Sequence, residues 1–118
     1  MEKFMLIFHW PVSQATAYQQ QSPEDMQAEI QKWNQWIGGI AAQHKMVGGE
    51  SLMPFGKVMT NGGQVVTDGP FTEGKEIIGG YTLVTAASVD EAVELAKGCP
   101  IFDTEDGSVE VRPVVNFG

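Results

Sequence analysis

The sequence predicts an α+β protein with a ferredoxin-like β-α-β-β-α-β plan that carries an inserted hairpin. The first observation behind this prediction is the order of the patterns, which run strand, helix, strand, hairpin, strand, helix, strand. The second is that both helical patterns open with a serine followed three residues later by an acid. The third is a first strand that is apolar on both of its faces. At 118 residues the chain has the length of one domain, so we expect a single domain over residues 1–118.

The first strand, at residues 3–10, predicts how the molecule associates. Alternate side chains from Phe4 to Phe8 point to one face, whereas Met5 and Ile7 point to the other. Both helices of a ferredoxin-like fold cover the same face of the sheet, so Met5 and Ile7 would face water in a single copy. Because exposed apolar patches of this kind mark interfaces, we expect a symmetric homodimer that packs sheet against sheet and leaves a cavity between the sheets.

A helix is expected after the polar and aperiodic residues 11–21, which predict a loop. Ser22 is placed to cap this helix, and Pro23 suits its first turn. Apolar residues then recur at spacings of four, three and four, which predicts one stripe facing the core. The stripe consists of Met26, Ile30, Trp33 and Ile37.

The second half of this helix contains the pair Gly38-Gly39, which predicts either close packing or a bend. His44 and Lys45 suit the negative end of the helix dipole. Gly48 suits the stop.

Short strands around turns are predicted for residues 46–68, where Asn61-Gly62 is typical of a hairpin turn. Residues 76–86 predict a further strand. Ser88 then opens the second helix.

The second helix is expected to end at Gly98 and Pro100. The last strand follows at residues 107–115, where valines alternate with Glu110 and Arg112, so the two kinds of side chain lie on opposite faces.

The composition excludes several classes of protein. An apolar content of 42% with 19% charged residues indicates a globular chain. Seven basic against fifteen acidic residues give a net charge of −8, which repels polyanions, so we expect no nucleic-acid partner. The apolar run at residues 4–8 is too short for a signal peptide or a membrane span, and we expect a cytoplasmic protein without a membrane partner.

The sulfur and imidazole groups predict neither a disulfide nor a metal site. Cys99 is the single cysteine; it is either a small buried hydrophobe or a thiol nucleophile near a helix end. His9 and His44 stand too far apart in the sequence for metal-ligand spacing, and we expect no cofactor.

Asp68, at the end of a strand-like run, is the main candidate for chemistry. One interpretation is structural: its side chain bonds to backbone amides two residues on, in an Asx-turn before Gly69 and Pro70. The other places Asp68 at the rim of the cavity between the sheets, where partial burial raises the pKa of a carboxyl and suits it to proton transfer. His9, which shares a face with Met5, is then its catalytic partner; otherwise it is a histidine of the rim.

Four further residues are candidates for substrate binding, each with a structural alternative. Lys75 and Arg112 could each bind an anionic substrate group; Lys75 is otherwise solvated, and Arg112 otherwise forms an interface salt bridge. Tyr81 could offer its hydroxyl to the cavity or pack along its strand. Phe71, together with Trp10, Trp33 and Trp36, could line a pocket for a flat molecule, although Trp33 belongs to the core stripe.

Several short motifs in order along the chain resemble the DGPF branch of the YCII-related family. They are SPE at 22–24, GGESL at 48–52, DGPF at 68–71, KE at 75–76, GGY at 79–81, DEA at 90–92 and GSVEVRPV at 107–114. The resemblance implies a dimeric α/β barrel of the ferredoxin-like type. It implies no particular reaction. Members of the family are often encoded beside extracytoplasmic-function sigma factors, which implies a link to stress response.

The resemblance also implies a candidate pair of catalytic residues. In the YCII branch a His–Asp pair in the cleft resembles an acid–base site, and Asp68 is the counterpart of its aspartate. The histidine of that pair lies in the first helix, where this chain has Trp33 and Trp36. We therefore expect a small-molecule site in which Asp68 works with His9. The alternative function is a ligand sensor without turnover, or a regulatory module that binds another protein.

Overall fold

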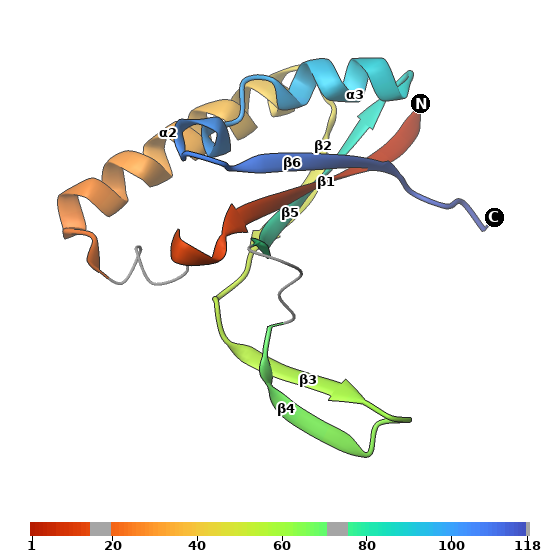
Figure 1. Ribbon diagram of the computed structural model, residues 1–118. Helices are drawn as coiled ribbons and strands as arrows, with labels where there is room; N and C mark the ends of the chain where they lie inside the picture. Colours follow the sequence, from red (N-terminus) through yellow and green to blue (C-terminus); the bar gives the residue numbers. More distant parts are fainter. Residues whose placement is uncertain (15–19, 71–75, 118) are drawn as a thin grey trace.

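The computed structural model describes residues 1–14, 20–70 and 76–117 as an α+β fold (Figure 1). Its antiparallel sheet has the strand order β2-β5-β1-β6, and a separate two-stranded ribbon is formed by β3 and β4. The strands are β1 (Glu2–Pro11), β2 (Met46–Ser51), β3 (Gly56–Thr60), β4 (Val65–Gly69), β5 (Glu76–Ala86) and β6 (Ser108–Pro113). The helices are η1 (Val12–Gln14), α2 (Pro23–Ala42), α3 (Val89–Ala96) and η2 (Pro100–Asp103). This order is compatible with the ferredoxin-like plan that the sequence predicts.

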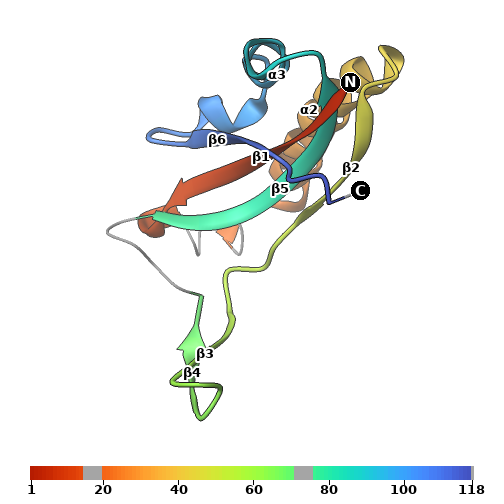
Figure 2. The same ribbon diagram turned by 90° about the vertical axis from the view of Figure 1, so that its right-hand side faces the viewer.

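The core lies between the sheet and the two longer helices, which cover the same side of the sheet (Figures 1 and 2). β1 contributes Phe4, Leu6 and Phe8, each at most 5% exposed. β5 contributes Val84 and Ala86, which are completely buried. Because side chains alternate along a strand, these residues leave Met5, Ile7 and their neighbours on the other face of the sheet. We call that side the open face.

The open face carries the apolar side chains that the sequence predicts. Met5 lies opposite Leu83, and Ile7 lies opposite Tyr81. All four are only partly buried in the single chain. β2 and β6 form the two edges of this sheet.

Both predicted helix starts are confirmed. The Ser22 hydroxyl accepts a hydrogen bond from the Asp25 backbone N–H at 3.1 Å. The Ser88 hydroxyl accepts one from the Glu91 N–H at 3.2 Å. Each bond satisfies an amide that has no partner within its own helix.

The predicted end of the first helix is wrong by several residues. α2 stops at Ala42, and His44 turns the chain with φ of 59°, in the left-handed region where a glycine was expected. Gly48 instead lies in β2. Of the two alternatives predicted for Gly38 and Gly39, close packing is wrong, because a Cβ built on either residue meets no described atom within 4 Å.

The predicted core stripe of α2 is correct only in its second half. Trp33 packs against the core, whereas Met26 is 36% and Ile30 is 52% exposed. The first turns of α2 extend beyond the sheet (Figure 1), so this part of the stripe has no sheet beneath it.

The predicted hairpin at Asn61-Gly62 is confirmed as the turn between β3 and β4. Asn61, Gly62 and Gly63 all have positive φ, at 54°, 65° and 87°. Asparagine and glycine tolerate this region better than other residues. The ribbon stands apart from the four-stranded sheet (Figures 1 and 2).

An ion pair between Lys45 and Glu91 connects the end of α2 to the first turn of α3. Lys45 Nζ lies 2.8 Å from Glu91 Oε1, and both side chains are at least two-thirds buried. The hydrogen bond from Lys45 is the largest cause that lowers the pKa of Glu91 below its ordinary value of 4.5. Burial acts in the opposite direction, and the charge of Lys45 and a backbone hydrogen bond from Ala87 add to the lowering.

We expect this ion pair to stabilise the fold above pH 4.5 and to lose its effect in acid. The unfolded chain takes up a proton at Glu91 before the folded chain does, so folding stability falls as the pH drops through the lowered pKa. Urea unfolding between pH 3 and 7 should show a shallower acid loss in Glu91→Gln than in the wild type. Glu94→Gln, which removes an exposed pair with Lys97, is the matched control and should follow the wild type. Identical acid profiles for wild type and Glu91→Gln would contradict this assignment.

Within the described part of the chain, no helix has both the length and the apolar character needed to cross a bilayer.

Candidate functional site on the open face

His9, near the end of β1, lies between two carboxylates on the open face. Its Nε2 N–H donates to Oε1 of Glu110 at 3.0 Å. Its Nδ1 lies 3.7 Å from Oε2 of Glu76. The imidazole is 20% exposed, whereas both carboxylates are about half exposed. A doubly protonated ring can form an ion pair with both carboxylates, whereas a neutral ring with its proton on Nε2 donates only to Glu110.

A shift in strand register places Glu76 beside His9. Phe8 pairs with Gly80, but His9 pairs with Ile78, so Gly79 has no partner on β1. Such a bulge interrupts the alternation of side chains, so the residues of β5 before Gly79 lie on the faces opposite to those that an unbroken strand would give them. Without it, Glu76 would point toward the helices.

Gly79 also allows the indole of Trp10 to approach β5. A Cβ built on Gly79 would lie 2.1 Å from Cδ1 and Nε1 of Trp10. No side chain fits at that distance, so glycine is required for this bulge.

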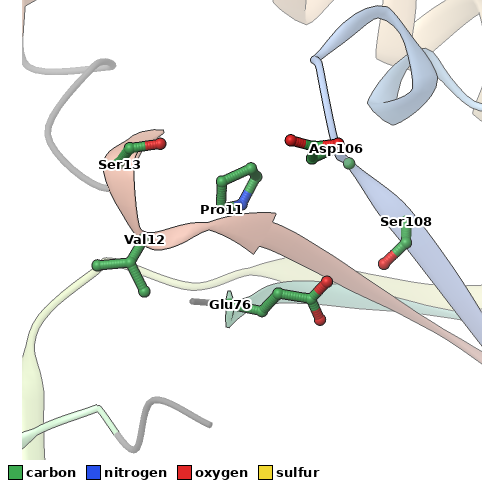
Figure 3. Close-up of a pocket in the computed structure, with 7 residues that line it drawn as sticks. Pro11, Val12, Ser13, Glu76, Asp106 and Ser108 are labelled. Carbon is green, nitrogen blue, oxygen red and sulfur yellow. The ribbon is translucent and has the colours of Figure 1, made fainter. Parts of the chain in front are cut away.

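A shallow depression of about 670 Å³ opens beside these groups, at the end of β1 and the start of β6 (Figure 3). In Figure 3 the carboxylate of Glu76 and the hydroxyl of Ser108 face the same space. Ser108 pairs directly with His9 across the two strands. The lining residues are Pro11, Val12, Ser13, Glu76, Asp106, Gly107 and Ser108.

Among the residues that the structure describes, the charges around the depression are mainly negative. Glu76 and Asp106 line it, and Glu110 lies behind His9. Arg112 is the basic residue of β6, and its Nε lies 3.7 Å from Oε2 of Glu110. The potential at this end of the open face therefore favours a cation or a hydrogen-bond donor over an anion.

Asp68, the predicted partner of His9, is not brought to His9 within one chain. It lies on β4, where its carboxylate is 91% exposed and forms an ion pair with Lys57 at 2.5 Å. Lys57 is the residue opposite Asp68 in the ribbon. The ribbon stands away from the end of β1 that carries His9 (Figure 1).

The other predicted site residues fall into two groups. Tyr81 lies on the open face opposite Ile7, and Arg112 lies opposite Met5. Lys75 and Phe71 lie outside the described residues.

The tryptophans form a cluster that packs against the core. The rings of Trp33 and Trp36 meet nearly at right angles, with centroids 5.8 Å apart, and both touch Phe8. The ring centroids of Trp10 and Trp33 are 6.4 Å apart. The indole N–H of Trp36 donates to the Leu95 carbonyl at 2.9 Å, which joins α2 to α3.

Cys99 is buried in the core, as the structural interpretation of this residue predicts. Burial raises the pKa of its thiol to about 12, so the reactive thiolate is scarce at neutral pH. This environment does not suit a nucleophile. Among the described residues, no group of three or more His, Cys, Asp or Glu side chains is arranged to hold a metal ion.

Glu76 and Glu110 are the partners of His9 that the sequence did not identify. The position of Glu110 beside His9 could have been predicted. Glu110 alternates with the valines of the last strand, and in a ferredoxin-like sheet that strand is the neighbour of the first strand. The position of Glu76 could not have been predicted, because its side of the sheet depends on the bulge at Gly79.

Comparison with known proteins places the chain in one family. A relative in Rhizobium meliloti (strain 1021), described as an uncharacterized protein, is 41% identical over 56 residues. That match covers 48% of this chain and 45% of the relative, so the chain spans about half the length of the curated relative that it matches. The family model of the YCII-related domain matches residues 12–118, which include every described element after β1. The chain therefore belongs to the YCII-related family.

Proposed function

We propose that this protein binds a small polar organic molecule beside His9, and that two copies pack sheet to sheet to enclose the site. The observation that carries the proposal is the position of His9. It lies between Glu76 and Glu110, beside a depression that Glu76 helps to line. The same face of the sheet carries the apolar side chains of Met5 and Ile7 further along β1. An imidazole with carboxylate partners is a common acid–base group in enzymes.

In this proposal His9 transfers the proton and Glu110 orients the ring. Glu110 accepts a hydrogen bond from Nε2, which leaves Nδ1 directed toward Glu76, a residue that lines the depression. A bound hydroxyl or amine near Nδ1 would exchange its proton there. Tyr81 and Arg112 face the enclosed space between the two sheets. Asp68 would join this site only from the second copy, because its own chain holds it on the ribbon.

The ligand class follows from the charges. With two carboxylates on the lining and a third behind His9, an amine is favoured, a neutral hydroxyl is accepted and a carboxylate is disfavoured. The barrel formed by two sheets is the dimeric arrangement that the family resemblance implies.

A second candidate function is a regulatory protein without turnover. The exposed β3–β4 ribbon, with Met59 at 64% and Val66 at 55% exposure, favours a role in contacts between proteins. In that case the depression would sense a ligand, and no reaction would follow.

The ligand proposal is tested with ethanolamine, glycerol and propionate as probes of the three charge classes. We expect millimolar ethanolamine to shift the NMR signals of the His9 ring and of the Ser108 amide most strongly, glycerol less and propionate least. In His9→Ala, the shift of the Ser108 amide should be abolished. His44→Asn is the matched control, because asparagine tolerates the left-handed φ of His44 and that residue lies outside the site.

Two outcomes would overturn the proposal. One is that none of the three probes shifts signals at this end of the open face. The other is that the shift of the Ser108 amide persists in His9→Ala. Asp68→Asn separates the role of Asp68: unchanged ethanolamine binding removes this residue from the site, whichever copy carries it.

A further inference from the structure

We propose that the β3–β4 ribbon is an arm that packs against a second copy of this chain. The proposal rests on the pairing of two copies proposed above and adds a separate contact to it. The open face supplies one surface of the pair, and the arm supplies another. We define the arm as residues 52–70.

The ribbon of the arm has no third strand within the described part of the chain. Two-stranded ribbons are at best marginally stable alone in water and need a further strand or helix to pack against. No residue of the ribbon is buried; most are exposed, and Val58 and Gly69 are half-buried. Both views show the ribbon standing off the sheet and away from the helices (Figures 1 and 2).

The arm presents an apolar surface. Met59 and Val66 lie directly opposite each other in the ribbon. Val65, which lies on the other face of the ribbon, is 41% exposed, and the stem before β3 exposes three more large apolar side chains at 52% to 65%. Those three are Leu52, Met53 and Phe55. Surfaces of this kind mark contacts between proteins.

The charge distribution suits a second copy. The charged side chains of the arm are Lys57 and Asp68, which pair with each other, so the arm is electrically neutral. The net charge of −8 therefore belongs entirely to the rest of the chain. A neutral apolar arm can approach an acidic copy without repulsion, whereas a basic partner would be attracted to the body of the chain rather than to the arm.

The available area favours reciprocal arms over a single contact with another protein. From the exposed fractions, the six apolar side chains of the arm offer on the order of 600 Å² per chain when both faces of the ribbon and the stem are counted. That is less than the roughly 800 Å² per partner of a standard stable interface. In a two-fold symmetric pair each copy both gives and receives an arm, so the contact is doubled. The contact between the open faces then adds to it.

The first experiment measures self-association by sedimentation equilibrium at micromolar concentration. We expect the wild type to sediment at twice the chain mass of 12.8 kDa. Combining Met59→Asp with Val66→Asp should weaken the dimer at least tenfold. The matched control combines Asn61→Asp with Gln64→Asp, which adds the same charge in the turn, and should dimerise like the wild type. If the test variant does not fold, a chain with residues 56–69 replaced by Gly-Ser is measured in the same way.

The second experiment detects the arm on the other copy directly. Because Cys99 is buried and its thiol pKa is raised to about 12, a nitroxide attached through Gln64→Cys should label only the arm. The spin-labelled variant, without ¹⁵N, is mixed with ¹⁵N-labelled wild type. The nitroxide should then broaden the amide signals of wild-type residues outside the wild type's own arm. A dimer without such broadening would overturn the proposal, as would a monomeric wild type.

Ile7→Glu distinguishes the contact between the open faces from the contact of the arm, because it places a charge on the open face and leaves the arm unchanged. If Ile7→Glu weakens the dimer and the arm variants do not, the arm proposal fails and the sheet pairing stands. If only the arm variants weaken it, the sheet pairing fails and the arm proposal stands.

Discussion

Gly79→Ala should lower the free energy of unfolding by about 2–3 kcal/mol, because the added Cβ would overlap the Trp10 indole. That Cβ would lie 2.1 Å from two ring atoms, and Trp10 cannot retreat freely because it packs against the core beside Trp33. The substitution should also release the bulge that holds Glu76 on the face of His9. Urea unfolding at fixed protein concentration measures the first effect, and the NMR signals of the His9 ring measure the second.

Gly38→Ala is the matched control for Gly79→Ala and should act in the opposite direction. It lies inside α2 with no described atom within 4 Å of the added Cβ, so alanine should stabilise the helix by about 0.5–1 kcal/mol. If Gly79→Ala unfolds at the same urea concentration as the wild type, the contact between Trp10 and Gly79 is wrong. The explanation of how Glu76 reaches His9 would then be wrong as well.

Phe8→Ala should lower the free energy of unfolding by about 3–5 kcal/mol, the usual range for a buried aromatic residue. Phe8 is 5% exposed, and its ring contacts Trp33 and Trp36 edge to face, with centroids 5.0 and 5.9 Å away. Such ring pairs add about 0.5–1.5 kcal/mol to the burial of their area. Equilibrium urea unfolding gives the total loss, again at fixed protein concentration because dimerisation would shift the midpoint.

The contribution of the rings is separated from that of the buried volume by two comparisons. Phe8→Leu retains most of the apolar volume and should lose clearly less than Phe8→Ala. A double-mutant cycle between Phe8→Leu and Trp33→Leu should give a coupling energy within the range expected for an aromatic pair. Additive losses in the cycle would show that the edge-to-face geometry contributes nothing beyond burial.

Much of the fold was predictable because local signals and the global plan agree. Ser22 and Ser88 begin the helices as their spacing to the following acids predicts. Asn61-Gly62 turns the hairpin because these residue types tolerate positive φ. The end of α2 was less predictable, since His44 adopts a left-handed conformation that the sequence pattern reserves for glycine.

The candidate site was predictable only in part. The alternation along β1 correctly placed His9 on the face opposite Phe8. The position of Glu76 could not be predicted, because the unpaired Gly79 reverses the faces of the residues that precede it in β5. Asp68 lies near the end of a strand, as predicted, but that strand belongs to a ribbon outside the main sheet. Strand patterns give the face of a residue and not the sheet to which its strand belongs.

The edges of the four-stranded sheet limit how many copies can assemble. β2 has a register shift between Met46 and Gly48, and β6 ends at Pro113, which has no amide to donate. Irregular or proline-terminated edges resist the lateral addition of strands from other molecules. Growth of the sheet into a ribbon-like polymer is therefore disfavoured at both margins. Association through the open face is instead self-limiting. Each molecule has one such face, so once two copies have paired, neither has another open face with which to bind a third.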